Sequence, residues 1–459
     1  MTLTKVIKVQ LKADEQTFAY LDGQSKICNW LYNCLLEKAN ELKKEFIETG
    51  DEESAKTVYT ERGLRNLIPA LKKEYPFLCS VYSSPLKNAA LRLSSAIQAH
   101  QKCKKGKRKG TSGWPKFRSW KTKWFSLLYD EPNKGFKIVK DTLVLSLGID
   151  KEGKRLRLEL QIKEPHLLRN QTLRNLRIVK EAGFYYAIFT VQTEVCKPKP
   201  IQKMIALDPN HKNLAYGVDL DGKAIEIAAP HFLKIHDTRI DELKSKRDRC
   251  SKTSKEVPIL DENGQPTDKI KKLPSRRWRK YHKALERALH KRREQTKSFM
   301  FTVAHSLCQK YDCVGIGNYT PNGSGKTTSM RRAMNNRSLI GRFKEILSWT
   351  AQKSGKTYIE YDETGTTRTC HACGYRVEEG LDPSIRDWVC PSCCTEHIRD
   401  ENAAINGLQK ILRDLKTKIL VPCSGLVSVM ERWAWRVLPG GIEMSLSRQE
   451  RRSVAASRN

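Results

Sequence analysis

Two closely spaced pairs of cysteines form the most specific chemical pattern in the sequence: a CxxC motif is followed, sixteen residues later, by a second one. The four cysteines are Cys370, Cys373, Cys390 and Cys393. Two such knuckles bring four thiolates around one tetrahedral Zn2+, and no coordination position stays open for a substrate. We therefore predict a zinc ribbon over residues 370–394 with one structural zinc ion, and we leave the adjacent His371 and Cys394 out of its ligand shell.

Two aspartates lie where a metal-dependent nuclease would need them. Asp208 follows the apolar run 204–207, and Asp400 follows the second cysteine pair at the start of a helical pattern. Hydrolysis of a phosphodiester by two Mg2+ ions, held about 4 Å apart, requires a few carboxylates that converge from different elements. Taken singly, Asp208 also fits a turn and Asp400 a helix cap. Their order along the chain favours the metal site.

The segments that must position these acids alternate between strand and helix periodicity. The expected elements, in chain order, are strands 204–207, 214–220 and 224–228, a basic helical region with a hairpin-like loop at 260–266, helix 276–310, strand 313–316, helix 338–354 and strand 357–361. Three strands with an acid after the first, then helix, strand, helix and strand, is the order of an RNase H-like domain. We assign residues 197–369 and 395–415 to this domain.

The first half of the chain combines strand periodicity with a helical insert. Alternating apolar residues predict a strand at 7–11, and short β-type runs recur between 136 and 192, whereas 25–101 has helical periodicity. We therefore expect an α+β multidomain protein. It comprises a β-rich, barrel-like domain (1–24 and 126–196), a helical insert (25–125), and the RNase H-like α/β domain with the zinc ribbon embedded in it. The polar, basic tail 416–459 is expected to be disordered, or ordered only by RNA.

The chain carries a large excess of positive charge. Its 85 Lys and Arg against 51 Asp and Glu give a formal net charge of +34. A compact protein with this excess repels itself unless a polyanion neutralises it, which indicates nucleic acid or an anionic membrane surface. No apolar run reaches the roughly 20 residues that span a bilayer, and residues 1–13 lack the apolar core of a secretory signal. We therefore expect a nucleic-acid-binding protein, although charge alone also fits a ribosome-like basic protein.

Basic stretches could supply the contacts to phosphate. They are Lys104–Lys109, Lys244–Arg249 and Arg276–Arg293, the last interleaved with Trp278, Tyr281 and His282. The Gly-Ser-Gly-Lys-Thr run at 323–327 resembles a phosphate-binding loop. The complete GxxxxGK[ST] pattern, however, requires a glycine at position 320, where this chain has Thr320. We interpret the stretch around Gly323–Gly325 as a lid beside the nuclease cleft and predict no nucleotide hydrolysis.

Three segments in a fixed order resemble the transposon-encoded TnpB nucleases and their descendants, the compact type V CRISPR effectors. These segments are Leu207–Ala215 (LDPNHKNLA), Thr366–Gly374 (TTRTCHACG) and Arg399–Asn406 (RDENAAIN). The basic Trp114–Arg118 stretch (WPKFR) is a weaker likeness in the N-terminal half. The sharp motifs span about residues 204 to 415.

The resemblance implies an RNA-guided DNA endonuclease with a RuvC-type site. Its cofactors would be two Mg2+ ions, one structural Zn2+ and a guide RNA made from a neighbouring non-coding region or a CRISPR array. Its target would be double-stranded DNA with a short flanking motif, opened so that one strand is displaced, while the basic stretches hold the A-form guide–target duplex by its backbone. The protein would act in the prokaryotic cytoplasm, associated with the nucleoid and not with membranes, as a monomer or homodimer on the RNA.

One position departs from the pattern that the resemblance implies. In much of the family a catalytic Glu follows the strand at 313–316, where this chain has Gly317. Some lineages resembling this chain have Gly there and a Glu just ahead of the Thr-Thr of the ribbon motif, and Glu363 occupies the matching place. We therefore favour Asp208, Glu363 and Asp400 as the catalytic, magnesium-binding acids.

Alternatives remain open for both the site and the function. Glu360 and Asp362 are less favoured donors near Glu363. If no acid replaces the one missing at Gly317, the chain is a nuclease-inactive, RNA-guided DNA-binding protein similar to a repressor. A guide-free transposition protein or zinc-ribbon regulator, in which the acids are incidental, is the third interpretation.

Overall fold

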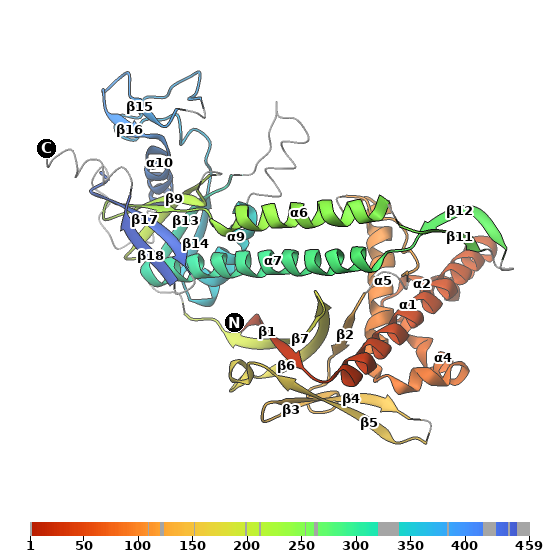
Figure 1. The fold of residues 1–459 in the computed structure, drawn as a ribbon. Coiled ribbons are helices and arrows are strands. Elements are labelled where there is room, and N and C mark those ends of the chain that lie inside the picture. The colour runs from red at the N-terminus through yellow and green to blue at the C-terminus, as the bar shows by residue number, and fades with distance from the viewer. Residues whose placement is uncertain are drawn as a thin grey trace. The chain divides into compact units, whose positions relative to one another are not determined.

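The computed structural model describes two compact units, Thr2–Thr193 and Glu194–Asn459 (Figure 1). The residues it describes are 2–108, 110–119, 124–150, 152–197, 200–210, 213–252, 254–260, 265–319, 339–382, 385–415, 428–438 and 441–447. The lid expected around Gly323–Gly325 lies outside the described residues, as do Lys109, His211 and Lys212. No described helix is long and apolar enough to cross a membrane.

The N-terminal unit contains a seven-stranded sheet in the order β2-β6-β7-β1-β5-β4-β3. Its strands are β1 (Thr2–Lys12), β2 (Ser126–Tyr129), β3 (Phe136–Val139), β4 (Thr142–Ile149), β5 (Arg155–Ile162), β6 (Leu173–Glu181) and β7 (Phe184–Glu194). Burial alternates along β7, because successive side chains point to opposite faces of a strand. The strands thus come from both ends of the unit, with the helices inserted between β1 and β2.

The helical insert begins earlier than its periodicity predicts. Its elements are α1 (Glu15–Thr49), α2 (Glu52–Tyr59), α3 (Gly63–Asn66), α4 (Ile68–Glu74) and α5 (Ser83–Lys104), with a 3-10 helix η1 (Pro76–Ser80) before α5; a second 3-10 helix, η2 (Pro165–Leu168), lies outside the insert, between β5 and β6. Asp14 caps α1 by accepting a hydrogen bond from the Thr17 backbone N–H, and Gly50 ends it in the left-handed region at φ 76°. The boundary expected at 24/25 is therefore wrong by ten residues, since the capping aspartate fixes the helix start.

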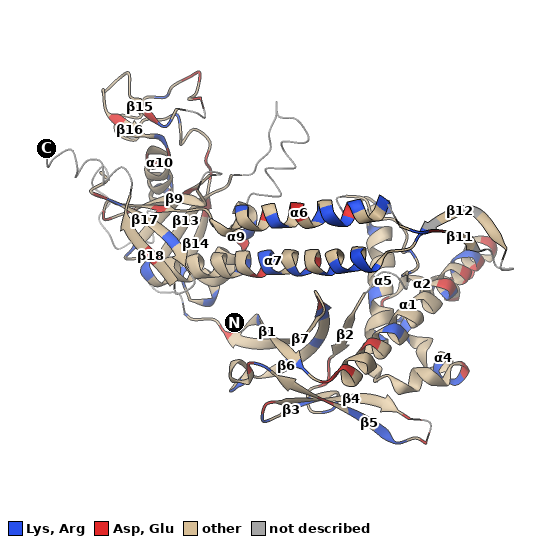
Figure 2. Cartoon of the chain, viewed as in Figure 1, with Lys and Arg blue, Asp and Glu red and all other residues tan. Residues whose placement is uncertain are grey.

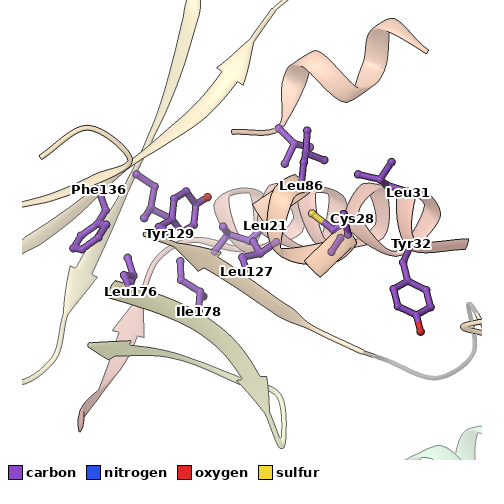
Figure 3. Packing of buried hydrophobic residues seen from close by; sticks show 14 of the residues in the cluster. Leu21, Cys28, Leu31, Tyr32, Leu86, Leu127, Tyr129, Phe136, Leu176 and Ile178 are labelled. Carbon is purple, nitrogen blue, oxygen red and sulfur yellow. The ribbon is translucent and has the colours of Figure 1, made fainter. Parts of the chain in front are cut away.

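One apolar core joins the insert to the sheet (Figure 3). Leu21 and Leu31 of α1 and Leu86 of α5 are fully buried, and Tyr129 and Ile178 line the same core from the sheet. Figure 3 shows these side chains converging from helices and strands. Burial of this extent makes the N-terminal unit a single packed body and not a sheet with a loosely attached insert.

The C-terminal unit contains a second seven-stranded sheet, in the order β14-β13-β8-β9-β10-β17-β18. Its strands are β8 (Met204–Pro209), β9 (Ala215–Asp219), β10 (Lys223–Ile227), β13 (Cys313–Gly317), β14 (Thr357–Tyr361), β17 (Glu431–Leu438) and β18 (Gly441–Leu446). Strands β8, β13 and β14 are parallel, and β9 runs antiparallel to β8. The first five strands therefore have the RNase H-like order that the sequence predicts.

Helices cover both faces of this sheet. Apolar residues of α7 (Arg276–Lys310) and α9 (Ile340–Lys353) pack against one face, and those of α10 (Arg399–Asp414) pack against the other. Helix α7 pairs with α6 (Phe232–Lys252), and the short hairpin of β11 (Glu256–Leu260) and β12 (Pro266–Lys272) connects the two helices (Figure 1). A further two-stranded sheet, β15 (Asp387–Val389) with β16 (Glu396–Ile398), lies in the cysteine-rich segment before α10.

Part of the C-terminal tail is ordered within the sheet, which corrects the prediction of disorder over 416–459. Strand β17 pairs in parallel with β10 over five residue pairs from Lys223↔Glu431 to Ile227↔Trp435, and β18 pairs with β17. Trp435 is 1% exposed and belongs to the core shared with α7 and α9. This segment joins the sheet because β17 has an apolar face with two tryptophans, although the sequence around it is polar and basic.

The buried indole provides a test of this correction. We expect Trp435→Ala to lower the free energy of unfolding by about 3–5 kcal/mol, as is typical for a fully buried Trp. The matched control is Trp433→Ala, on the same face of β17 but only partly buried, for which a clearly smaller loss is expected. Urea unfolding of both variants measures this; equally small losses would mean that the tail is not part of the folded sheet.

Candidate acidic and zinc centres

Asp208 lies at the carboxyl end of β8, which pairs in parallel with β13 on one side and antiparallel with β9 on the other. Leu207 pairs with Ile316 of β13, so that Asp208 and Gly317 follow next to each other on neighbouring strands. Desolvation raises the pKa of the Asp208 carboxyl well above its usual range, and the negative charges of Glu363 and Asp400 raise it further. The three acids that the sequence singles out therefore lie near enough to one another to interact electrostatically.

Glu363 occupies the space that the missing side chain of Gly317 leaves. It follows β14 by two residues, and Gly317 pairs with Tyr361 at the end of that strand. A Cβ atom at position 317 would overlap the Glu363 Oε1, Cδ and Cγ atoms. Glu363 reaches this position because its backbone N–H donates to Asn318 Oδ1 at 3.2 Å. The glycine is thus what allows the carboxylate of the neighbouring strand to lie above β13.

The Glu363 carboxyl is poorly compensated. Its Oε1 atom is buried and has no hydrogen-bond partner among the described residues. Desolvation raises the pKa of Glu363 to about 7, although Lys344, a backbone hydrogen bond from Tyr319 and Lys410 act in the opposite direction. Leaving a buried acceptor unsatisfied costs about 1–3 kcal/mol, and more when the group is charged. A cation at this position would remove that cost.

Asp400 enters the site from the first turn of α10. Arg386 Nη1 donates to both of its carboxylate oxygens, at 3.1 and 3.3 Å, and Asn210 Nδ2 lies 3.4 Å from Oδ2. The side chain is 17% exposed. Position in the first turn also suits a carboxylate, because the helix dipole is positive there. Arg386 and Asn210 are site residues that sequence reasoning missed, and Asn210 could have been found because it lies within the same motif as Asp208.

The three acids have the donor atoms that a divalent cation prefers, but their carboxylate oxygens do not form a tight cluster. Their oxygens are the hard donors that Mg2+ prefers. Asp208, Glu363 and Asp400 are not among the sets of described residues whose ligand atoms all lie within 4.8 Å of one another. Both carboxylate oxygens of Asp400 accept from Arg386 instead. The arrangement therefore provides an orphaned Glu363 oxygen and two further carboxylates at one edge of the sheet.

The less favoured acids are engaged elsewhere. Glu360 accepts a hydrogen bond from the Tyr358 hydroxyl at 2.7 Å and lies 3.5 Å from Lys344 Nζ. Asp362 is exposed and caps a turn, accepting from the backbone N–H and hydroxyl of Thr364. Both contacts are typical of structural roles, so Glu363 is the member of the three that faces Asp208.

The four predicted cysteines converge. The Sγ atoms of Cys370, Cys373, Cys390 and Cys393 lie within 4.8 Å of one another. The two knuckles have matching geometry: Gly374 N–H donates to Cys370 O, and Cys394 N–H donates to Cys390 O, both at 2.9 Å. Gly374 and Cys394 both have positive φ, 78° and 56°. Four thiolates at this spacing are compatible with a structural zinc ribbon, and Cys394 is the turn residue of the second knuckle.

A histidine that sequence reasoning missed supports the cysteine cluster. His397 of β16 is 4% exposed, and its Nε2 lies 3.0 Å from Cys370 Sγ. Its ring also packs against Trp388 and His371. His371, in turn, lies outside the cluster and contacts Asn402 through Nδ1 at 3.1 Å. Histidine contacts of this kind orient metal ligands, but a single histidine three residues before Asp400 gives no distinctive sequence signal.

Positive charge follows the paired helices α6 and α7 (Figure 2). Lys and Arg recur along both helices and on the connecting hairpin, whereas few acids accompany them. Some of the aromatic interleaving is internal, since the Trp278 ring stacks on His282 at 4.6 Å. Ion pairs engage some of these cations, such as Arg247 with Asp248 and Arg292 with Asp237. The excess of Lys and Arg over Asp and Glu along the two helices still offers phosphates an array of cations.

The knuckle geometry gives a matched pair of variants for the cysteine cluster. Cys393→Ala removes one of the four converging thiolates and should abolish retention of about one Zn2+ per chain through gel filtration with a mild chelator. Cys394→Ala removes a neighbouring thiol that is not one of the four converging ones, and this variant should retain the metal. Elemental analysis of both proteins decides the matter; zinc loss from the Cys394 variant alone would overturn the ligand assignment.

The raised pKa of Glu363 predicts a pH-dependent stability effect. Between about pH 4.5 and 7 the folded chain holds a proton on Glu363 that the unfolded chain has released, so the free energy of unfolding falls as the pH rises through this range and stays lower above pH 7. In the presence of a chelator and above about pH 7, the free energy of unfolding of Glu363→Gln should therefore exceed that of the wild type by about 1–3 kcal/mol. This difference should disappear near pH 4.5, and thermal unfolding over this pH range measures it.

Asp362→Asn should change the stability of the folded chain in the opposite direction. Hydrogen bonds from Thr364 lower the pKa of Asp362, so its ionised form stabilises the folded chain above the unfolded pKa of 3.8. Removing the charge should lower the melting temperature at neutral pH and have little effect below that value. A Glu363→Gln variant that behaves like Asp362→Asn would contradict the burial of an uncompensated carboxyl.

Sequence comparisons connect the region around both centres to known proteins. Residues 341–407 match the family model of the Cas12f1-like TNB domain. The TnpB-like proteins L79 and L770 of Acanthamoeba polyphaga mimivirus are each 30% identical to the chain over 146 residues, which is 31% of this chain and 26% of the relative. The chain thus matches about a quarter of the length of these curated relatives.

The fold extends the likeness beyond the matched segment. The chain is similar to the protein in the cryo-EM structure of a Cas12f1-sgRNA-target DNA complex, with a TM-score of 0.52 and 12% sequence identity, over 88% of this chain and 98% of the other. At this identity the match concerns the fold. The domain match and the TnpB-like relatives show that part of the chain is similar to TnpB-type proteins and compact type V effectors, and the fold match agrees with that similarity.

Proposed function

We propose that the protein is an RNA-guided DNA endonuclease in which Asp208, Glu363 and Asp400 form the catalytic acidic centre. The observation that carries this proposal is the position of Glu363, whose carboxyl fills the space above Gly317 beside the end of β8. The acid expected after β13 is replaced by one from the adjacent parallel strand. The same end of the sheet therefore still receives three carboxylates.

The geometry favours this function over the nuclease-inactive alternative. An inactive relative has no use for a buried carboxyl with an unsatisfied oxygen, because any neutral side chain in its place would avoid the cost of desolvation. Retaining a Glu against such a cost is typical of functional sites. Gly317 is therefore better interpreted as space for Glu363 than as a lost acid.

The chain's own residues have distinct tasks in this proposal. Asp208 and Glu363 offer carboxylate oxygens that must lose their protons before they bind a cation, so occupancy should rise with pH through the region of the Glu363 pKa of about 7. Arg386 and Asn210 hold Asp400 at the start of α10. Two bound Mg2+ ions would supply activation of water and stabilisation of the leaving oxygen. Zn2+ in the cysteine cluster would be structural.

The partners follow from charge and from the relatives. A chain with a formal net charge of +34 and cations along α6 and α7 suits a duplex bound through its backbone. A relative of similar fold is known in complex with sgRNA and target DNA. We infer that a guide RNA selects the target here as well, that a short flanking motif licenses opening of the DNA, and that one strand is displaced.

Plasmid cleavage tests the proposed acids directly. With a cognate guide RNA and Mg2+, Asp208→Ala and Glu363→Ala should each reduce the cleavage rate by about a hundredfold or more, since outer-shell partners of a metal already contribute 10–100-fold. Guide-dependent DNA binding should persist in both variants. Glu360→Ala, which removes an exposed acid of β14, is the matched control and should cleave nearly as well as the wild type.

Gly317→Glu separates the two interpretations of the glycine. If Gly317 makes room for Glu363, the added side chain collides with it and cleavage falls. If the wild type is inactive because the acid is missing, the same substitution creates cleavage. No cutting by the wild type, combined with tight guide-dependent binding, would identify a repressor-like relative. Absence of any guide-dependent binding would favour the guide-free transposition protein.

A further inference from the structure

Two asparagines on one face of α10 hold the turn that follows Glu363. Asn402 and Asn406 are one helical turn apart and are 1% and 7% exposed. The Asn406 side-chain amide donates to the backbone carbonyls of Thr366 and Thr369 at 2.8 and 2.7 Å. The Asn402 amide donates to the same two carbonyls at 3.3 and 2.8 Å. We call these four hydrogen bonds the asparagine clamp.

The clamp is connected to the acidic centre on both sides. Thr366 donates from its backbone N–H and its hydroxyl to the Glu363 carbonyl, at 3.0 and 2.9 Å. On the helix, Asn402 lies two residues after Asp400. Gly407 then lets α10 approach the end of β14, because a Cβ there would overlap the Tyr361 ring. The distance between Glu363 and Asp400 is therefore set by how the 363–369 turn docks on α10.

The first zinc knuckle is attached to the same helix through one of the two asparagines. Asn402 Oδ1 accepts from the backbone N–H of His371 at 2.9 Å, and Gln409 Nε2 donates to the His371 carbonyl at 3.3 Å. His371 lies between Cys370 and Cys373 of the cysteine cluster. Asn402 is thus shared by the knuckle and the Glu363 turn, whereas the side-chain hydrogen bonds of Asn406 within the described part of the chain go to the turn.

We propose that Asn402 and Asn406 are positioning residues for the acidic centre, and that Asn402 couples cation binding there to zinc binding in the ribbon. Zinc fixes the conformation of the knuckle, the knuckle fixes the Asn402 side chain, and the clamp fixes the turn that carries Glu363. Occupying either site then favours the geometry that the other requires, and the effect is reciprocal because it is an equilibrium linkage. This inference rests on the proposed function in requiring a divalent cation at Asp208, Glu363 and Asp400.

Three variants of the clamp separate its parts. Asn406→Ala weakens the hold on the turn and leaves the knuckle contact intact. Asn402→Asp keeps an oxygen for the His371 N–H but removes the donor to the two carbonyls. Asn402→Ala removes both links. Arg413→Ala, an exposed position further along α10, is the control for substitutions in this helix.

The experiment measures linkage and not cleavage, on the full-length, zinc-loaded chain. Mn2+ binding is followed by electron paramagnetic resonance, with Asp208→Ala defining the background, and zinc release to a chromogenic chelator is timed with and without millimolar Mg2+. In the wild type and in Arg413→Ala, Mg2+ should slow zinc release by about fivefold or more, the lower range of typical couplings. All three clamp variants should bind Mn2+ more weakly. Asn402→Ala and Asn402→Asp should lose the Mg2+ effect on zinc release.

The outcomes distinguish this inference from the proposed function. If the wild type binds no Mn2+ above the Asp208→Ala background, the acidic centre itself is wrong. If the wild type binds Mn2+ and the clamp variants, folded and zinc-loaded, bind it equally well with zinc release unchanged by Mg2+, the coupling is wrong and the acidic centre stands. Loss of zinc from Asn406→Ala, which does not touch the knuckle, would show a general loss of structure and overturn the specific role of Asn402.

Discussion

The C-terminal unit is organised around the placement of negative charge at one edge of a parallel sheet. Strands β8 and β13 end side by side, β14 pairs with β13, and their carboxyl ends bring Asp208, Gly317 and the Glu363 turn together. Carboxylates in this position repel each other and are desolvated, as the raised pKa values of Asp208 and Glu363 indicate. The surrounding fold must hold them in place against this repulsion, and the sheet, α10 and the asparagine clamp provide that restraint.

Positive charge in the chain is distributed so that it compensates this edge only in part. Arg386 pairs with Asp400, and Lys344 and Lys410 moderate the charge of Glu363, but one Glu363 oxygen has no partner among the described residues. Part of the large basic excess lies instead along α6 and α7 (Figure 2). Such a separation leaves the acidic edge able to accept cations and the helices able to accept phosphates.

The sequence predicts those parts of the site that depend on local order, and misses those that depend on distant pairing. The cysteine knuckles and the Asp208 strand follow from spacing and periodicity alone, whereas Glu363 is what the family resemblance implies. The asparagine clamp does not follow, because the carbonyls it binds lie in an irregular turn without periodicity. Strand β17 contains the apolar run Trp433-Ala434-Trp435, yet its partner β10 lies 208 residues earlier in the register (431 − 223), and nothing local specifies a parallel pairing at that distance.

The exchange of Gly317 for Glu363 has a simple geometric basis in parallel pairing. Neighbouring strands lie about 4.8 Å apart, which is comparable to the reach of a glutamate side chain. A Glu that follows β14 closely can therefore place its carboxyl above β13, provided that the residue on β13 has no side chain of its own. Only glycine meets that condition at position 317, where even a Cβ atom would overlap the carboxyl. The missing acid and the relocated one are thus not two independent changes: each of them requires the other if the three carboxylates are to stay at the same edge of the sheet.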